Sequence, residues 1–153
     1  VCDLHAKASH VLSKGMRAIS YLVWSKRGVS KTEAQWVLNS LKRFLSMTQI
    51  KIRIRSWVDV CSPNEVRRRV TDLLWEGVYP EIFMKLGLPV EGGLDILLGA
   101  MEERFREDPA LIKAWRDIQA LQGNEDAAMK IDRHLLALQN KQMEQLAEQV
   151  AVQ

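Results

Sequence analysis

The chain has 153 residues, of which 47% are hydrophobic and 27% are charged. This composition argues against global disorder, and no apolar run reaches the ~20 residues that a membrane-spanning helix needs. The charge is divided unevenly: residues 1–75 contain 14 Lys/Arg and 5 Asp/Glu, whereas residues 76–153 contain 8 and 14. We therefore predict a single domain over residues 1–153 that is basic in its first half and acidic in its second.

The first half begins with two helix signals. The segment from His10 to Trp24 predicts a helix that ends before Gly28. Ser30 and Glu33 have the spacing of a capping box, in which the serine hydroxyl accepts a backbone N–H and the glutamate reaches back to the cap. A stripe of helical periodicity follows at Ala34, Val37, Leu38, Leu41 and Leu45.

Residues 50–61 fit two structures. Residues 50–55 alternate apolar and basic side chains, which is typical of a half-buried strand. The same segment has one apolar helical face formed by Ile50, Ile54, Trp57, Val58 and Cys61. Because the sequence has no second strand-like run to satisfy the backbone of a first, we predict a helix here.

A Gly/Pro-rich segment separates the two halves. Before it, Ser62 and Glu65 form a second capping-box pattern with Pro63 at the first helical position, and that helix should end near Gly77. Residues 77–93 then contain six Gly or Pro, with a short helix expected at 79–86. This segment is either a hinge between a basic subdomain 1–76 and an acidic helical subdomain 94–153, or a loop within one bundle.

The acidic half predicts three further helices. The first contains Leu94 to Phe105, the second begins at Asp108-Pro109 and ends at Gly123, and Asn124 caps the third. The third helix has many Gln residues after Leu136 and its apolar stripe thins, so we expect its beginning to be packed and its end frayed. The alternative is a helix that needs a partner from another chain.

Together these patterns predict an all-α fold. We expect a helical bundle or an orthogonal helical array of five to seven helices, with a Gly/Pro-rich hinge near residues 77–93. A charge-complementary contact between the basic and acidic halves, within one molecule or head-to-tail between two, is a further hypothesis.

A basic surface that includes tryptophan is the strongest functional candidate. Tryptophans at helical spacing usually pack in a core or at its edge, but aromatic side chains at a core edge also form interface hot spots, and basic clusters attract acidic proteins or phosphates. The alternative is an ordinary solubilising face, and Arg67 to Arg69 cannot share one helical face because they spread over about 200°. The candidate residues are Trp24, Trp36, Lys42, Arg43, Lys51, Arg53, Arg55, Arg67 and Arg68.

No pattern in the sequence points to catalysis, a cofactor or a metal site. His5 and His10 lack the i, i+4 spacing of a helical metal pair, and no glycine-rich phosphate loop is present. Cys2 and Cys61 lack CxxC spacing, which favours free thiols and a cytoplasmic or nuclear location. An exported form that has a disulfide and has lost a signal peptide is the alternative.

Residues 16–74 also show a likeness to one known family. The resemblance is to the N-terminal helical domain of transcription elongation factor S-II and the related integrase-binding domains, and it rests on the spacing of Leu38, Leu41, Phe44 or Leu45, Met47 and Ile50. This chain has one additional residue before Ile50 and lacks the family's downstream Thr/Gly pattern. We therefore assign no family and transfer no binding residue.

The sequence thus predicts a non-catalytic interaction, scaffold or adaptor domain. Its basic surface would bind an acidic or helical protein, or a second copy of the chain. We expect no interaction with a membrane. The alternative is a nucleic-acid-binding accessory domain that uses the basic face of residues 42–69. A steep salt dependence of binding to unrelated DNA or RNA would favour that alternative.

Overall fold

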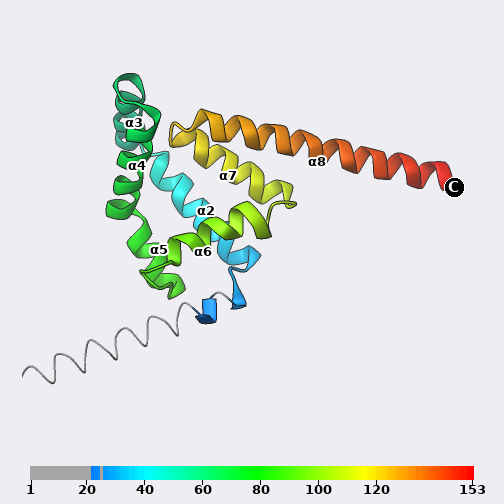
Figure 1. Ribbon diagram of the computed structural model, residues 1–153, viewed down its shortest axis with the longest axis horizontal. Helices are drawn as coiled ribbons and strands as arrows, with labels where there is room; N and C mark the ends of the chain where they lie inside the picture. Colours follow the sequence, from blue (N-terminus) through cyan, green and yellow to red (C-terminus); the bar gives the residue numbers. More distant parts are fainter. Residues whose placement is uncertain (1–21, 25) are drawn as a thin grey trace, which may run out of the picture.

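The computed structural model describes residues 22–24 and 26–153, and within them every regular element is a helix (Figure 1). The predicted helix from His10 to Trp24 lies mostly outside these residues. The described helices exceed the expected five to seven because the segment around Leu94 to Phe105 forms two elements. The elements are α2 (Lys31–Leu45), α3 (Thr48–Val60), α4 (Pro63–Gly77), α5 (Tyr79–Leu86), α6 (Gly93–Gly99), the π-helical turn η1 (Ala100–Arg104), α7 (Pro109–Leu121) and α8 (Glu125–Val152).

Helices α2 and α7 pack against each other in the core. Helix α2 starts at the predicted capping box, because the Ser30 hydroxyl accepts the Glu33 N–H and the Glu33 carboxylate accepts the Ser30 N–H. Its stripe buries Leu45, which has no exposed surface, and α7 buries Ile118 to the same degree. Full burial of such a side chain stabilises the fold by about 1.5–3 kcal/mol.

Residues 48–60 are helical, as predicted, and form α3. Only Ile54 is buried on this helix, so α3 contributes little to the core and exposes most of its surface. Helix α4 packs against it, and Ser62 caps α4 by accepting the Glu65 N–H. This is the only one of the two capping-box hydrogen bonds that forms here. The Glu65 carboxylate accepts hydrogen bonds from two arginines of α4 and does not reach back to the backbone N–H of Ser62.

The Gly/Pro-rich segment 77–93 packs into the core. It contains α5 at the predicted residues 79–86, and Gly87 ends this helix with a φ of 68°, a conformation that favours glycine. The Trp24 indole N–H donates to the Gly87 carbonyl at 3.0 Å. Trp75 lies edge-on to Tyr79 and to Phe83, with ring centroids about 5 Å apart. The hinge, the subdomain division and the bundle or array arrangement stay predictions.

Helix α8 differs from the others because much of it extends beyond the body of the molecule (Figure 1). Its first part packs on α7, where Ala128 is buried and the His134 ring lies 2.6 Å from the Arg106 carbonyl oxygen. Residues 139–152 are all exposed, yet the helix continues to Val152. Asn124 precedes this helix as predicted, but its side chain donates to the Gln119 amide oxygen rather than capping the helix.

Candidate interaction surface

The three basic residues of α3 do not share a face. On a strand Lys51, Arg53 and Arg55 would point the same way, but at about 100° per residue Arg53 lies roughly opposite the other two. All three side chains are exposed. The helix therefore directs Lys51 and Arg55 towards the turn between α7 and α8, and it places Arg53 over Trp57 of the same helix.

Trp57 joins the basic residues of α3 to those of α4. The Arg53 guanidinium lies 5.4 Å from the Trp57 ring centroid, and that of Arg69 on α4 lies 5.8 Å from it. Trp57 is only partly buried, so both arginines and part of the indole are at the surface. We call Arg53, Trp57 and Arg69 the Trp57 cluster. Cation–π contacts at exposed sites are worth about 0.5–1 kcal/mol each.

Trp57 and Arg69 are not among the site residues predicted from the sequence. The i, i+4 spacing of Arg53 and Trp57 is a signal that places both on one helical face. Arg69 could not be found in the same way, because its position over the indole depends on how α4 packs on α3.

Glu65 partly neutralises the arginines of α4. Its carboxylate accepts a hydrogen bond from Arg68 at 2.7 Å and one from Arg69 at 3.0 Å. These hydrogen bonds lower the pKa of Glu65 to about 2. Arg67 donates to the Asn64 side-chain oxygen at 2.7 Å. Within this triplet the positive charge is held in place by local partners, yet all three arginine side chains stay exposed.

An open hollow of about 470 Å³ lies between α3 and the turn that joins α7 to α8. Lys51 and Arg55 line it on one side, and Glu125 lines it on the other. Gly123 allows close approach here, because its φ is 76° and an added Cβ would lie 2.6 Å from a methyl carbon of Val58. The hollow therefore combines both charge signs and has no single electrostatic preference.

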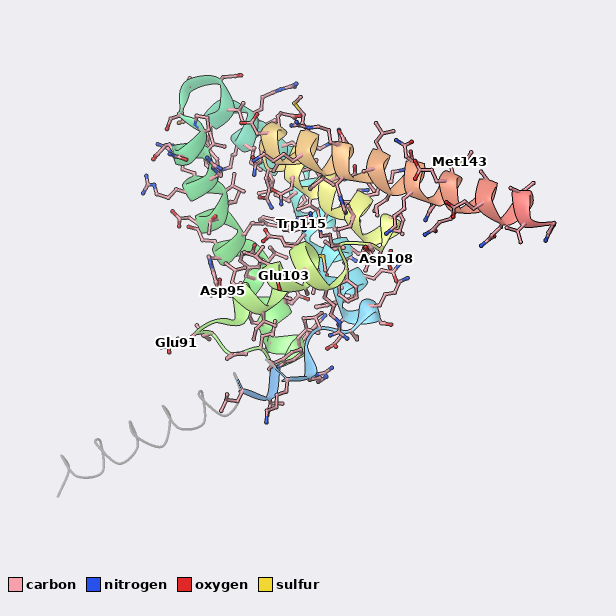
Figure 2. All side chains as sticks on the ribbon, turned by 45° about the vertical axis from the view of Figure 1, so that its right-hand side comes forward. Glu91, Asp95, Glu103, Asp108, Trp115 and Met143 are labelled. Atoms are coloured by element: carbon pink, nitrogen blue, oxygen red, sulfur yellow. The ribbon has the colours of Figure 1, made fainter. Side chains whose placement is uncertain are left out.

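Lys42 belongs to a different contact. Its ammonium lies 3.3 Å from a carboxylate oxygen of Asp117 on α7, and that of Lys31 lies 2.8 Å from Asp108 at the start of α7. The basic and acidic halves thus meet within one molecule across α2 and α7, as one form of the charge hypothesis expected. Figure 2 shows Asp108 at this end of α7. Arg43, also on α2, is exposed and has no ion pair within the described residues.

The two tryptophans selected from the sequence do not lie with the basic cluster. Trp24 is only 5% exposed, with the Arg27 guanidinium 4.5 Å from its ring centroid, so its side chain is not part of a surface. Trp36 is partly buried, and the ammonium nitrogen of Lys85 on α5 lies 5.4 Å from its ring centroid. Trp24 is therefore buried rather than at the predicted basic surface, and its indole N–H donates to the Gly87 carbonyl.

The described residues hold no group of three His, Cys, Asp or Glu side chains that could bind a metal ion. Cys61 is a partly buried thiol at the end of α3, and Cys2 lies outside the described residues. None of the helices between residues 22 and 153 that the structure describes is both long and apolar enough to cross a bilayer.

Comparisons with protein-family models, with curated proteins and with solved structures found no match. The likeness to the helical domain of elongation factor S-II is therefore not supported by any family match. A function is therefore inferred from the geometry of the α3–α4 surface.

Proposed function

We propose that this chain is a non-catalytic interaction module that binds an acidic or helical protein through the exposed surface of α3 and α4. The observation that carries the proposal is the Trp57 cluster, in which the guanidinium groups of two arginines from different helices lie 5.4 and 5.8 Å from the ring centroid of a partly exposed indole. An adaptor or scaffold role in a cytoplasmic or nuclear assembly follows from this proposal.

The charge of this region supports an acidic partner. Residues 42–69 contain eight Lys/Arg and two Asp/Glu, a net charge of +6. No ion pair is formed by Lys51, Arg53, Arg55 or Arg67 within the described residues, so these charges are available to a partner. Complementary charge accelerates association and selects the partner more than it adds affinity.

The Trp57 indole adds an aromatic contact surface, which the charged side chains alone do not provide. Trp and Arg are the residue types most enriched in interface hot spots, where a central aromatic contact is surrounded by polar groups. Pre-ordering by α3 and α4 lowers the entropy that binding would otherwise cost. The Glu65 carboxylate restrains Arg68 and Arg69 by accepting hydrogen bonds from both, so the positive charge beside the indole has a fixed position.

The experiment is a calorimetric titration with two probes: an acidic amphipathic helical peptide and an unrelated DNA duplex. At physiological ionic strength we expect the peptide to bind. We expect the Arg53→Ser/Arg69→Ser double variant to bind it about tenfold more weakly or worse, since it removes both cations beside Trp57.

The matched control is Arg106→Ser/Lys113→Ser, which removes the same charge from two exposed residues of the acidic half. We expect this variant to keep the affinity of the parent chain within about threefold. Equal losses in both variants would mean that only net charge matters and would overturn the proposal. DNA binding that falls steeply with salt and is lost in the Arg53/Arg69 variant would instead support the nucleic-acid function.

A further inference from the structure

The core is not completely filled where α6 crosses α2 (Figure 1). A cavity of about 20 Å³ lies there, with walls from α2, α5, α7 and the α6–η1 segment. Apart from two aromatic residues, the side chains that line it are all Ala, Val, Leu or Met. We call this space the α6 cavity. Its volume is sufficient for one water molecule, but a buried water also needs two or more polar partners.

The two aromatic residues bring polar groups to this apolar lining. Tyr79 of α5 and Trp115 of α7 both line the α6 cavity, and they are only 6% and 9% exposed. Neither the tyrosine hydroxyl nor the indole N–H forms a hydrogen bond within the described residues. Buried tyrosine and tryptophan normally have a hydrogen-bond partner. Because no fully enclosed side-chain polar atom among these residues lacks a partner, both groups are within reach of a molecule the size of water.

The surroundings of Tyr79 keep its hydroxyl away from bulk water. Burial raises the pKa of Tyr79 to about 12, and the ring lies edge-on to Trp75 and tilted against Phe83. A desolvated hydroxyl without a partner lowers stability, and an acceptor oxygen beside it would restore the lost hydrogen bond. An apolar lining with a few unused polar groups is typical of small-molecule sites.

The cover over the α6 cavity is thin. Leu94 and Leu98 are one turn apart on α6, line the cavity and are only partly buried, so the space lies about one side chain below the surface. Among the described elements, only η1 has its backbone close to α6 at several positions. Met101 of η1 also lines the cavity, and π-helical turns are frequent at functional sites. A change of rotamer at the two leucines would therefore open and enlarge the space.

We propose that the α6 cavity binds a small, mostly apolar molecule with one hydrogen-bond-accepting oxygen, such as a short ketone, ester or amide. The oxygen accepts a hydrogen bond from the Tyr79 hydroxyl, and the hydrocarbon part packs against the side chains of α2. Leu94 and Leu98 turn aside to admit it, since the closed cavity has room for only part of such a molecule. The lining shares no residue with the α3–α4 surface, so this inference does not depend on the function proposed there.

The experiment is a titration of the whole chain with cyclohexanone and with methylcyclohexane, which is similar in size but has no oxygen. NMR of methyl-labelled leucine and valine follows both ligands. We expect cyclohexanone to shift the methyl signals of Val37, Leu94 and Leu98, with a dissociation constant in the millimolar range. Tyr79→Phe should weaken cyclohexanone about fivefold and leave methylcyclohexane within about twofold, because it removes only the hydroxyl.

A substitution that fills the cavity tests the location. Val37→Ile adds one methyl group to the lining and should weaken both ligands about tenfold or more without lowering the midpoint of urea unfolding. The matched control is Val70→Ile on α4, since Val70 is buried but does not line the cavity. It should leave both affinities within about twofold and lower the urea midpoint, because it overpacks a filled part of the core.

Three outcomes would overturn the inference. The first is that neither ligand shifts these methyl signals up to its solubility limit. The second is binding that Val37→Ile does not weaken, which would place the ligands elsewhere on the molecule. The third is an equal change for both ligands in Tyr79→Phe, which would show that the hydroxyl does not recognise an oxygen.

Discussion

Two basic regions of this molecule have different surroundings. On α2, the ammonium groups of Lys31 and Lys42 lie 2.8 and 3.3 Å from carboxylates of Asp108 and Asp117 in the acidic half. On α3, Lys51, Arg53 and Arg55 have no ion pair within the described residues. The first region therefore contributes to holding the halves together, whereas the second leaves its charges at the surface.

The difference arises from packing rather than from residue type. Helix α2 is buried along five positions and lies against α7, so its flanking lysines meet the acids of that helix. Helix α3 buries only Ile54, so its arginines meet an aromatic ring and solvent. Between these two helices, most of the basic side chains without an ion pair within the described residues therefore lie on the less buried one, α3, and exposed Arg43 of α2 is the exception.

The largest expected effect is on the α2–α7 contact. Ile118→Ala should lower the free energy of unfolding by about 2–5 kcal/mol, because Ile118 is fully buried and the substitution leaves a cavity beside α2. Urea denaturation followed by far-ultraviolet circular dichroism measures this. Ile52→Ala on α3, where the side chain is 63% exposed, is the control and should change it by less than about 0.5 kcal/mol. Similar losses at both sites would contradict the comparison.

The next effect concerns the turn that holds α3 against the acidic half. Gly123→Ala should cost about 1–3 kcal/mol, because the φ of 76° is unfavourable for alanine and the new Cβ would meet Val58 at 2.6 Å. Thermal or urea unfolding measures it. Gly99→Ala is the matched control, since Gly99 is helical with no atom near the added Cβ, and it should stabilise by about 0.4–1 kcal/mol. A neutral Gly123→Ala would show that α3 is not held at this turn.

A smaller effect should appear at the start of α7. Asp108→Ala should cost about 0.5–2 kcal/mol, because the carboxylate caps the helix by accepting the Leu111 N–H and also pairs with Lys31. The hydrogen bond from Lys31 and those from the backbone lower the pKa of Asp108 below 3.8 despite partial burial. A lowered pKa contributes stability that is complete well above 3.8 and is lost as the pH falls through the folded-state value.

The pH profile separates the charge of Asp108 from its capping role. Asp108→Asn keeps a capping oxygen but cannot ionise, so the stability difference between it and the parent chain should shrink as the pH falls below 3.8. Unfolding by urea between pH 7 and pH 2.5 measures the difference. A constant difference over this range would contradict the ion pair with Lys31.

The smallest expected effect is at the exposed pair of Lys42 and Asp117. Lys42→Gln should cost about 0.2–1 kcal/mol at low salt and less at high salt, because exposed ion pairs are screened. Arg43→Gln, the neighbouring residue without an ion pair, provides the control and should be neutral. A double-mutant cycle with Asp117→Asn measures the coupling free energy of the pair directly. A coupling of zero would show that this pair does not stabilise the contact between the halves.

Local signals in the sequence were sufficient for most of the helices. Ser30 and Glu33 form the predicted capping box, residues 79–86 are helical, and Gly123 ends the helix that starts after Asp108. Each of these depends on hydrogen bonds or backbone angles within a few residues. Asn124 shows the limit even there, because a side chain on the preceding helix competes for its amide.

The candidate site was less predictable because it depends on contacts between helices. Nothing near Trp24 in the sequence shows that Gly87 accepts a hydrogen bond from its indole, and that contact takes it out of the proposed surface. The position of Arg69 beside Trp57 is not predictable from the sequence, because it requires the packing of α4 on α3. Whether residues 51–55 form a strand or a helix decides which basic side chains share a face, since a helix separates Arg53 from Lys51 and Arg55.

The interaction surface on α3 and α4 is tested most directly by an NMR titration of the labelled chain with the acidic helical peptide at physiological ionic strength. The indole N–H signals report each tryptophan separately. We predict that the Trp57 signal and the amide signals of α3 and α4 shift, while the signal of buried Trp24 stays in place. Shifts confined to α2 and α7, or no shifts at peptide excess, would contradict an interaction surface on α3 and α4.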